Sequence, residues 1–237
     1  MDRVARHLGL ARRVRISNVW LLETGGERFL VDTGHPVERL ALLLDLRRAG
    51  VQRRGDLAAI LLTHRHSDHA GNAAWLRNRF ACPVICHRDD APFLRGTVPP
   101  PPLLRRDTAL HQRILCWIED RFPARCEVDG VYSEGAWRHE LEVMPVPGHT
   151  EGSVVLYHGP TKTLFSGDAI LAGPPPLRSI EHLRLAVPGF SLDAARCHES
   201  ARRLLDGLPH VQTLCSGHGP AVRSGAHEKI SRLLSRE

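Results

Sequence analysis

The chain has 237 residues, of which 42% are hydrophobic and 24% are charged. This length suits one α/β domain, since single domains reach about 250 residues, and this composition excludes an intrinsically disordered chain. No segment approaches the roughly 20 apolar residues that cross a bilayer, and basic residues interrupt the apolar pairs of the N-terminal region, unlike a secretory signal. We therefore expect a single domain over residues 1–237 in the cytoplasm, without a membrane partner.

The formal net charge is +6, from 32 Lys and Arg against 26 Asp and Glu. The arginines are scattered in pairs, which is typical of solvated surfaces and not of one nucleic-acid footprint. Only 5% of the residues are aromatic, which argues against a surface on which single-stranded bases stack. Nucleic acid is therefore a disfavoured partner, although composition alone does not exclude it. Six Cys without a CxxC pair predict reduced, mostly buried thiols.

The first half of the chain alternates predicted strands and helices. Two apolar runs, Val14–Glu23 and Arg28–Val31, flank a Gly-Gly turn and predict a hairpin that ends at Asp32. Leu57–Thr63 is a short continuous apolar run, as expected of a strand buried on both faces. The other predicted elements are helices at Val37–Ala49, Ala70–Phe80 and Thr108–Phe122, and a strand at Pro83–Cys86.

The second half repeats this alternation. Strands are predicted at Leu141–Val146, Ser153–Tyr157, Thr163–Ser166 and Val211–Cys215, and helices at Leu192–Leu205 and near the end of the chain. In both halves, polar motifs follow directly after predicted strands. Loops of layered α/β folds converge at that edge of the sheet, so we expect the functional site there.

Side chains that bind metal ions are concentrated in the segment HRHSDH at residues 64–69. Imidazole and carboxylate are ligands that zinc accepts. His64 and His66 are two positions apart on an extended segment and project to the same side, so one ion can contact both. Asp68 and His69, at the turn into the next helix, can face a second ion. Four such side chains in six positions favour a metal site over isolated surface histidines.

This segment resembles the HxHxDH signature of the metallo-β-lactamase superfamily, and later loops resemble the rest of that signature in order. Residues 147–153 (PGHTEGS) are similar to its PGHTxGS loop, residues 166–168 (SGD) to its GD motif and residues 216–220 (SGHGP) to its final GHGP. Asp32 in VDTG matches its early aspartate. The resemblance implies an α/β fold, an αβ/βα sandwich in which two mixed β-sheets carry helices on their outer faces.

The resemblance also implies a dinuclear metal centre. The implied ligands are His64, His66 and His149 for the first metal, Asp68, His69 and His218 for the second, and Asp168 as the bridge. Two Zn²⁺ per chain are expected, with Fe or Mn as alternatives. Asp32 is expected either to cap the next backbone segment or, as the resemblance favours, to accept a hydrogen bond from a ligand histidine.

The implied reaction is metal-assisted hydrolysis by a hydroxide that bridges the two ions. Asp68 and Asp168 are the implied catalytic carboxylates. Asp68 would orient the hydroxide and pass a proton to the leaving group, whereas Asp168 would hold the two ions together.

Departures from particular branches narrow the substrate class. His69 after Asp68 disfavours the β-lactamase branch that carries Arg there, so β-lactamase activity is expected to be secondary at most. The segment after His218 is shorter than the helical extension with which glyoxalase II-like thioesterases bind glutathione, and Leu171 stands where quorum-quenching lactonases place Tyr. We expect a hydrolase of a small ester, thioester or lactone.

Two alternatives stay open, a compact endoribonuclease or phosphodiesterase of the same superfamily and a mononuclear-iron persulfide dioxygenase. The loop after Asp168 contains three candidate substrate contacts, His182, Arg178 and Arg184. An exposed loop position is an equally good interpretation of His182. The natural substrate and the oligomeric state are not set by the sequence.

Overall fold

The computed structural model describes residues 3–8, 16–103, 109–174 and 180–236. A six-stranded sheet runs in the order β1 (Arg3–Leu8), β2 (Val19–Thr24), β3 (Glu27–Val31), β4 (Ala59–Leu61), β5 (Val84–His87) and β6 (Gly130–Tyr132). A five-stranded sheet runs in the order β13 (Thr213–Ser216), β10 (Thr163–Gly167), β9 (Val154–His158), β8 (Leu141–Pro145) and β7 (Gly135–Ala136). A two-stranded ribbon pairs β11 (Ile170–Leu171) with β12 (Arg184–Leu185).

Seven α-helices and three short 3-10 helices are found among the described residues. The α-helices are α1 (Arg39–Arg48), α2 (Ser67–Ala70), α3 (Ala73–Phe80), α4 (Ala91–Arg95), α5 (Leu110–Arg121), α6 (Ala194–Gly207) and α7 (Ala226–Arg236). The 3-10 helices are η1 (Pro36–Glu38), η2 (Arg138–Glu140) and η3 (Pro188–Phe190).

The six-stranded sheet is buried on both faces because its central strands are apolar at successive positions. Side chains alternate between the two faces of a strand. Leu21 and Leu30 therefore pack with the apolar sides of α1 and α3, which contribute Leu46 and Leu76. Their neighbours Trp20 and Phe29 face the second sheet.

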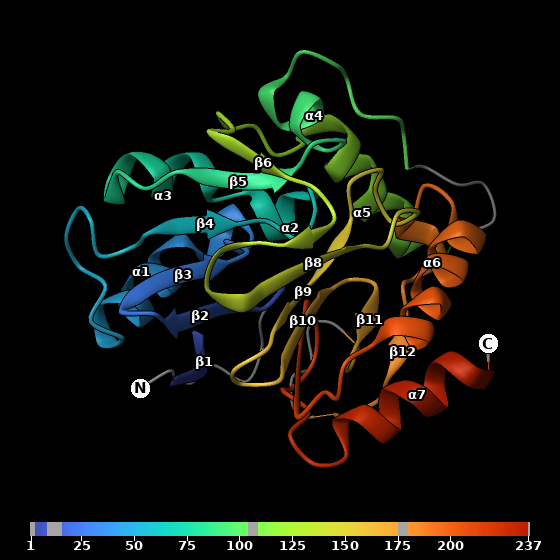
Figure 1. Ribbon diagram of the computed structural model, residues 1–237. Helices are drawn as coiled ribbons and strands as arrows, with labels where there is room; N and C mark the ends of the chain where they lie inside the picture. Colours follow the sequence, from blue (N-terminus) through green and yellow to red (C-terminus); the bar gives the residue numbers. More distant parts are fainter. Residues whose placement is uncertain (1–2, 9–15, 104–108, 175–179, 237) are drawn as a thin grey trace.

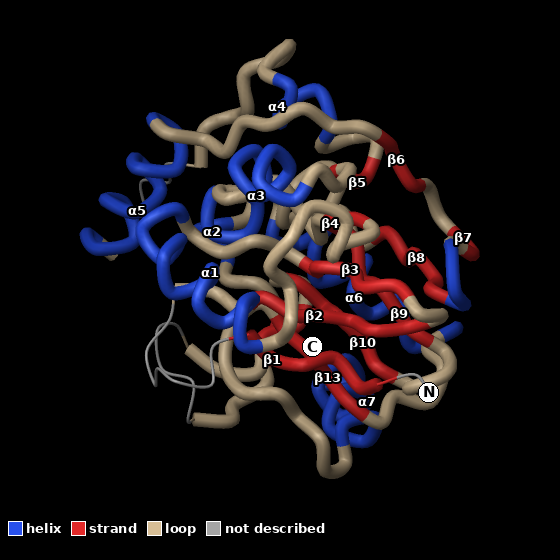
Figure 2. Tube along the Cα trace, turned by 90° about the vertical axis from the view of Figure 1, so that its left-hand side faces the viewer, coloured by secondary structure: helices blue, strands red, loops and turns tan. Residues whose placement is uncertain are grey.

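The five-stranded sheet is built in the same way. Leu164 of β10 packs outward with α6 and α7, which contribute Leu204 and Ile230. The adjacent Phe165 faces inward and packs against the first sheet. Figure 1 shows the resulting layers, with α1 and α3 on one side of the sheets and α6 and α7 on the other. Figure 2, turned by 90°, shows the strands in the centre of the molecule. The predicted αβ/βα sandwich is confirmed.

Parallel pairing brings the polar motifs to one edge. Strands β3, β4 and β5 are parallel to one another, as are β10 and β13. Asp32 follows β3, residues 64–69 follow β4 closely, Asp168 follows β10 and His218 follows β13. These segments therefore leave the carboxyl ends of their strands.

The predicted helix Ala70–Phe80 is divided in the structure. Residues 73–80 form α3, whereas Ala70 is the last residue of α2, which begins at Ser67; Gly71 and Asn72 separate the two helices. The Asn72 side-chain amide donates to the carbonyl oxygens of residues 33, 34 and 35, at 2.9, 3.1 and 3.0 Å. A Cβ at Gly71 would lie 2.1 Å from the Ser67 carbonyl oxygen. The break therefore ties the loop after Asp32 to the HRHSDH segment.

Six short elements were not predicted from the sequence. They are the strands β1, β6, β7, β11 and β12 and the helix α4, and the 3-10 helices η2 and η3 were not predicted either. Most of them have only two to five residues, which is too short for a hydrophobic period to be recognised. The predicted hairpin of β2 and β3 and the predicted C-terminal helix are confirmed.

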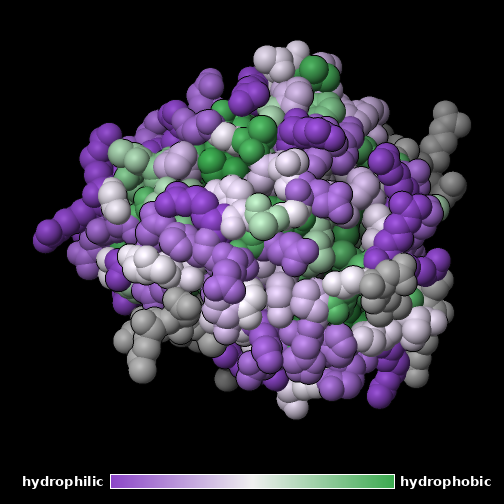
Figure 3. All heavy atoms as spheres, in the orientation of Figure 1, coloured by the Kyte–Doolittle hydropathy of each residue, from purple (hydrophilic) through white to green (hydrophobic). Residues whose placement is uncertain are grey.

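The surface is mainly hydrophilic on the face shown in Figure 3, with small apolar patches between polar side chains. Among the described residues, no helix combines the length and the apolar character that crossing a membrane requires. All six cysteines are free thiols and buried, as the sequence predicts.

Candidate metal centre

The structure brings all seven predicted ligand side chains together at the edge where the strands end. They form two groups, and within each group the ligand atoms lie within 4.8 Å of one another. The first group is His64, His66 and His149, and the second is Asp68, His69 and His218. A third combination, His64, His69 and Asp168, joins the two groups. Residues from four separate segments of the chain thus converge on one cluster.

The carboxylate of Asp168 lies between the two groups. Its Oδ1 is 3.2 Å from His69 Nε2, and its Oδ2 is 3.2 Å from His218 Nε2 and 3.7 Å from His149 Nε2. Asp68 lies on the second group only, with Oδ2 at 3.3 Å from His218 Nε2 and 3.5 Å from His69 Nε2. Asp168 is therefore the carboxylate placed to serve both groups.

Asp32 orients His69 from behind the cluster. Its Oδ2 accepts hydrogen bonds from His69 Nδ1 at 2.9 Å and from Thr63 Oγ1 at 2.8 Å, and its Oδ1 accepts from the Thr63 backbone N–H at 2.8 Å. Because an ionised carboxylate only accepts, the ring proton of His69 lies on Nδ1. Nε2, the other ring nitrogen, faces Asp68 and Asp168, and these carboxylates raise the pKa of His69 well above its usual value in spite of its burial. Of the two interpretations of Asp32, the hydrogen bond to a ligand-type histidine is the one observed.

Hydroxyl groups fix two more histidines in the same tautomer. Thr63 Oγ1 gives its proton to Asp32, so it accepts from His64 Nδ1 at 3.0 Å. Ser191 Oγ donates to a backbone carbonyl at 3.0 Å, so it accepts from His149 Nδ1 at 3.1 Å. In both rings the network assigns the proton to Nδ1 and leaves Nε2 bare.

The cluster contains buried atoms that lack a hydrogen-bond partner among the described residues. They are Nε2 of His64, His66, His69 and His149, Nδ1 of His218, and Oδ1 of Asp168. A buried polar atom without a partner costs about 1–3 kcal/mol, and so many in one place call for an explanation. Imidazole nitrogen and carboxylate oxygen are donors to zinc and to iron. The residues therefore fit a metal centre.

The charges of the two groups differ. Burial lowers the pKa of His149 to about 4 and the pKa of His64 and His66 well below the usual value, so these imidazoles are neutral. Burial also acts on His218, but Asp168 and Asp68 outweigh it and raise the pKa of His218 to about 9. The first group is thus a set of neutral imidazoles, and the second is built around two carboxylates that attract cations.

Comparison with known proteins agrees with this geometry. The model of the family described as the metallo-beta-lactamase superfamily matches residues 12–218. This chain belongs to the metallo-beta-lactamase superfamily. Within it, the chain is 28% identical over 214 residues to the probable metallo-hydrolase YybB of Bacillus subtilis (strain 168), a match that covers 86% of this chain and 81% of that protein. The family resemblance seen in the sequence is confirmed.

The chain is also similar to a curated enzyme and to a solved structure. It is 33% identical over 115 residues to a hydroxyacylglutathione hydrolase of Bdellovibrio bacteriovorus, but this match covers only 48% of the chain and 35% of that enzyme. The solved structure of TTHA1623 in a di-iron-bound form has a TM-score of 0.62 and 26% identity, covering 96% of this chain and 98% of that one.

Two carboxylates near the cluster, the half-buried Glu119 and the buried Asp90, were missed by sequence reasoning. Glu119 of α5 accepts from the Ser67 backbone N–H at 3.1 Å and from the Ser67 hydroxyl, so it holds the start of α2. Asp90, after β5, accepts from the Thr150 hydroxyl next to His149. Burial raises the pKa of Glu119 to about 7 and that of Asp90 to about 6. Each is a single acidic residue in a helix or just before one, and no sequence motif around it indicates these contacts.

The two predicted substrate contacts that the structure describes are, unlike the predicted metal ligands, not brought into the cluster. His182 is exposed. Arg184 lies on β12 and is half-buried, and its Nε has no hydrogen-bond partner among the described residues. Arg178 lies outside the described residues. No ion pair or hydrogen bond within the described part of the chain joins His182 or Arg184 to the cluster. Their role in substrate binding stays a prediction.

Gly148, next to His149, allows a close approach of two backbones. Its φ is +129°, and a Cβ there would lie 2.2 Å from Cys197 N and 2.7 Å from the Asp193 carbonyl oxygen at the start of α6. We expect Gly148→Ala to lower the free energy of unfolding by about 3–4 kcal/mol, from left-handed strain and overpacking together. Urea unfolding of the purified variant measures this loss.

Gly55→Ala is the matched control for this prediction. Gly55 also has a positive φ, +86°, but nothing lies within 4 Å of the position of its Cβ. It should lose only the strain of the left-handed backbone, about 1–2 kcal/mol. Equal losses in the two variants would show that the contact with α6 does not constrain the loop of His149.

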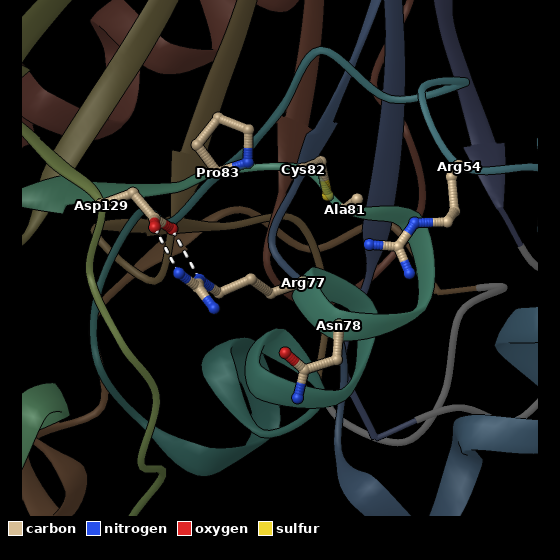
Figure 4. Close-up of a pocket in the computed structure, with 7 residues that line it drawn as sticks. All are labelled: Arg54, Arg77, Asn78, Ala81, Cys82, Pro83 and Asp129. Carbon is tan, nitrogen blue, oxygen red and sulfur yellow. Dashed lines mark hydrogen bonds and ion pairs between the residues drawn. The ribbon is translucent and has the colours of Figure 1, made fainter.

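A cavity of about 620 Å³ lies elsewhere in the molecule, at the amino-terminal side of β5 (Figure 4). Its lining residues are Arg54, Arg77, Asn78, Ala81, Cys82, Pro83 and Asp129. Arg77 is held by Asp129, with Nε 2.8 Å from Oδ2. Burial raises the pKa of the Cys82 thiol to about 11, so it is protonated near neutral pH and is a poor nucleophile. The cavity shares no residue with the His and Asp cluster, which remains the candidate site of the chemistry.

Proposed function

We propose that this chain is a dinuclear, zinc-dependent hydrolase of a small ester, thioester or lactone. The observation that carries the proposal is the set of buried imidazole nitrogens without hydrogen-bond partners that surrounds the Asp168 carboxylate. Membership of the superfamily and the metallo-hydrolase named among its relatives support the hydrolase class.

In this proposal each group of ligands holds one ion. His64, His66 and His149 hold the first, Asp68, His69 and His218 hold the second, and Asp168 is shared. When bound, such ions polarise a carbonyl oxygen and lower the pKa of the water that they hold from about 15.7 to about 7. The di-iron-bound form of TTHA1623 supports a two-metal centre and makes iron, beside zinc and manganese, a metal to be tested.

The two carboxylates are assigned different tasks. The Asp68 side chain is 25% exposed and the Asp168 side chain is 12% exposed. Asp68 can therefore reach a substrate that enters from solvent, and it is the better group to receive a proton and pass it to a leaving group. Asp168 is shared by the two groups, so its task is to hold their separation and to offset the charge of the ions.

The relatives of this chain favour one of the three candidate substrate classes. The partial match to a hydroxyacylglutathione hydrolase favours a thioester among the three candidates, but it covers about a third of that enzyme. No contact of the described residues selects a particular acyl group. The proposal is therefore stated for small esters, thioesters and lactones together.

Metal analysis combined with a substrate panel tests the proposal. We expect protein isolated without added metal to contain about two transition-metal equivalents per chain and to hydrolyse one member of a panel of p-nitrophenyl esters, thioesters and homoserine lactones. The panel also includes a cephalosporin and RNA as alternative substrates. One iron per chain with thiol-dependent oxygen uptake would instead indicate a dioxygenase, and preferential cleavage of RNA a nuclease. Full hydrolytic activity in a metal-free preparation contradicts the proposal.

A further inference from the structure

Arg65, between two of the ligand-type histidines, points into the protein. Its side chain is only 3% exposed. The guanidinium lies 3.8 Å from Asp90 Oδ1, 3.3 Å from Glu151 Oε2 and 4.9 Å from the centre of the Phe93 ring. A buried cation is kept only where partners offset its desolvation. Among these partners, Asp90 is the fully buried carboxylate and Glu151 is 31% exposed.

Asp90 contacts the loop of His149 at two points. Its Oδ2 accepts from Thr150 Oγ1 at 2.8 Å, and its Oδ1 accepts from the Gly152 backbone N–H at 2.9 Å. A Cβ at Gly152 would lie 2.6 Å from the Asp90 backbone nitrogen, so the two segments are in direct contact. Asp90 thus binds the residues on the C-terminal side of His149.

These contacts join the two segments that form the first ligand group. Arg65 belongs to the segment of His64 and His66, and Thr150 follows His149 directly. The only other tie between these segments that the described backbone hydrogen bonds provide is Val154 N to the Thr63 carbonyl, at 2.9 Å. That bond fixes the start of β9. Side chains tie residues 149–152 to the HRHSDH segment, through Arg65 with Glu151 and through Arg65 with the buried Asp90. His149 itself is also bonded to Ser191 and Leu192.

We propose that Asp90, paired with Arg65, is a positioning residue that sets the distance between the His149 loop and the HRHSDH segment, and with it the metal affinity of the first ligand group. The inference rests on the proposed metal centre. Asp90 does not touch the ion or the substrate in this scheme. It acts through the loop that carries His149.

The test is the metal affinity of variants at residue 90, measured by competition with a chelator. Removal of a partner that orients a metal ligand typically costs 10- to 100-fold in metal affinity. We expect Asp90→Ala to weaken one of the two metal equivalents by about this factor and to leave the other within about twofold. Cobalt-loaded protein gives a second readout, because the visible absorption of the weakened site should change at saturating Co²⁺ even where turnover is not followed.

Asp90→Asn keeps the test informative if the Ala variant does not fold. The amide oxygen can still accept from Gly152, while the Thr150 hydroxyl can turn its proton to Ser153, 2.8 Å away. The charge of Arg65 loses its buried partner in this variant. We expect a loss of affinity smaller than that of Asp90→Ala but at least about threefold, at the same metal equivalent.

Asp129→Asn is the matched control, since Asp129 also pairs with an arginine and accepts from a backbone N–H, that of Val84, but at the cavity of Figure 4. It should bind both equivalents like the wild type. Wild-type affinity in Asp90→Asn, or equal weakening of both equivalents at residue 90, overturns the inference. A wild-type protein that binds no metal overturns the proposed function itself, so the two failures are distinguishable.

Discussion

Asp168→Ala is expected to reduce hydrolysis by about 10²- to 10³-fold while the chain still folds. Its carboxylate is the one that lies within 3.2 Å of His69 and His218 and within 3.7 Å of His149. Two dications about 3.5–4 Å apart repel each other, and a shared carboxylate offsets that repulsion. The measurement is kcat on the best substrate of the panel, together with metal content and circular dichroism of the same preparation.

Asp168→Asn separates the charge of residue 168 from its shape. The amide has nearly the same size, but it carries no negative charge and presents one N–H side to the imidazoles. We expect it to lose almost as much activity as Asp168→Ala. His66→Ala should lose a comparable amount, because it removes a ligand of the first group. Wild-type turnover in Asp168→Asn would show that the shared charge is not needed.

A surface carboxylate serves as control for these variants. Asp56 accepts from the backbone N–H groups of Gln52 and Arg53 in an exposed turn. Asp56→Asn removes one negative charge from the protein without touching the cluster. It should keep wild-type kcat and metal content, so that a change in net charge alone does not explain the loss at Asp168.

The parts of the fold that could be predicted are those that a short, continuous stretch of sequence determines. The hairpin of β2 and β3 follows from two apolar runs around a Gly-Gly turn, and the buried strand β4 follows from a continuous apolar segment. The layers follow from these strands and from amphipathic helices. The HRHSDH segment is equally local, because four ligand-type side chains stand within six residues.

The groups that support the cluster could not be predicted, because their contacts are set by the tertiary structure. Asp90 and Thr150 are 60 residues apart, and Glu119 and Ser67 are 52 apart. Ser191, which accepts from His149, is 42 residues away in the chain. No spacing rule connects such pairs. They become recognisable only when the strands have brought their carboxyl ends together. Ser191 then explains why the His149 imidazole has a fixed tautomer.

The division between α2 and α3 has the same origin. The apolar pattern of residues 70–80 is continuous with one helix, and a helix through Gly71 costs only about 1 kcal/mol on propensity alone. The three hydrogen bonds that Asn72 donates to the loop after Asp32 end the helix there. Tertiary contacts of Asn72 thus override the helix propensity of residues 70–80 next to the HRHSDH segment.

Asp32→Ala is expected to lower the free energy of unfolding of the metal-free protein by about 3–5 kcal/mol. It leaves His69 Nδ1 and both donors of Thr63 without their acceptor, and all of these groups are buried. Asp32 also has a φ of +59°, a region that Asp and Asn adopt more readily than Ala. Urea unfolding measures the loss, and the metal content of the refolded variant reports on the second ligand group.

Asp32→Asn tests the tautomer argument with less damage to the fold. Its backbone tolerates a positive φ, and its amide oxygen can still accept from the Thr63 backbone N–H, so a loss of only about 1–2 kcal/mol is expected. The amide N–H₂ then lies where Oδ2 accepted from His69. Because two donors cannot pair, His69 must move its proton to Nε2, the atom that faces Asp168 at 3.2 Å. The variant should therefore fold but bind only one metal equivalent tightly, and tight binding of both would mean that Asp32 stabilises the loop without selecting the ligand atom of His69.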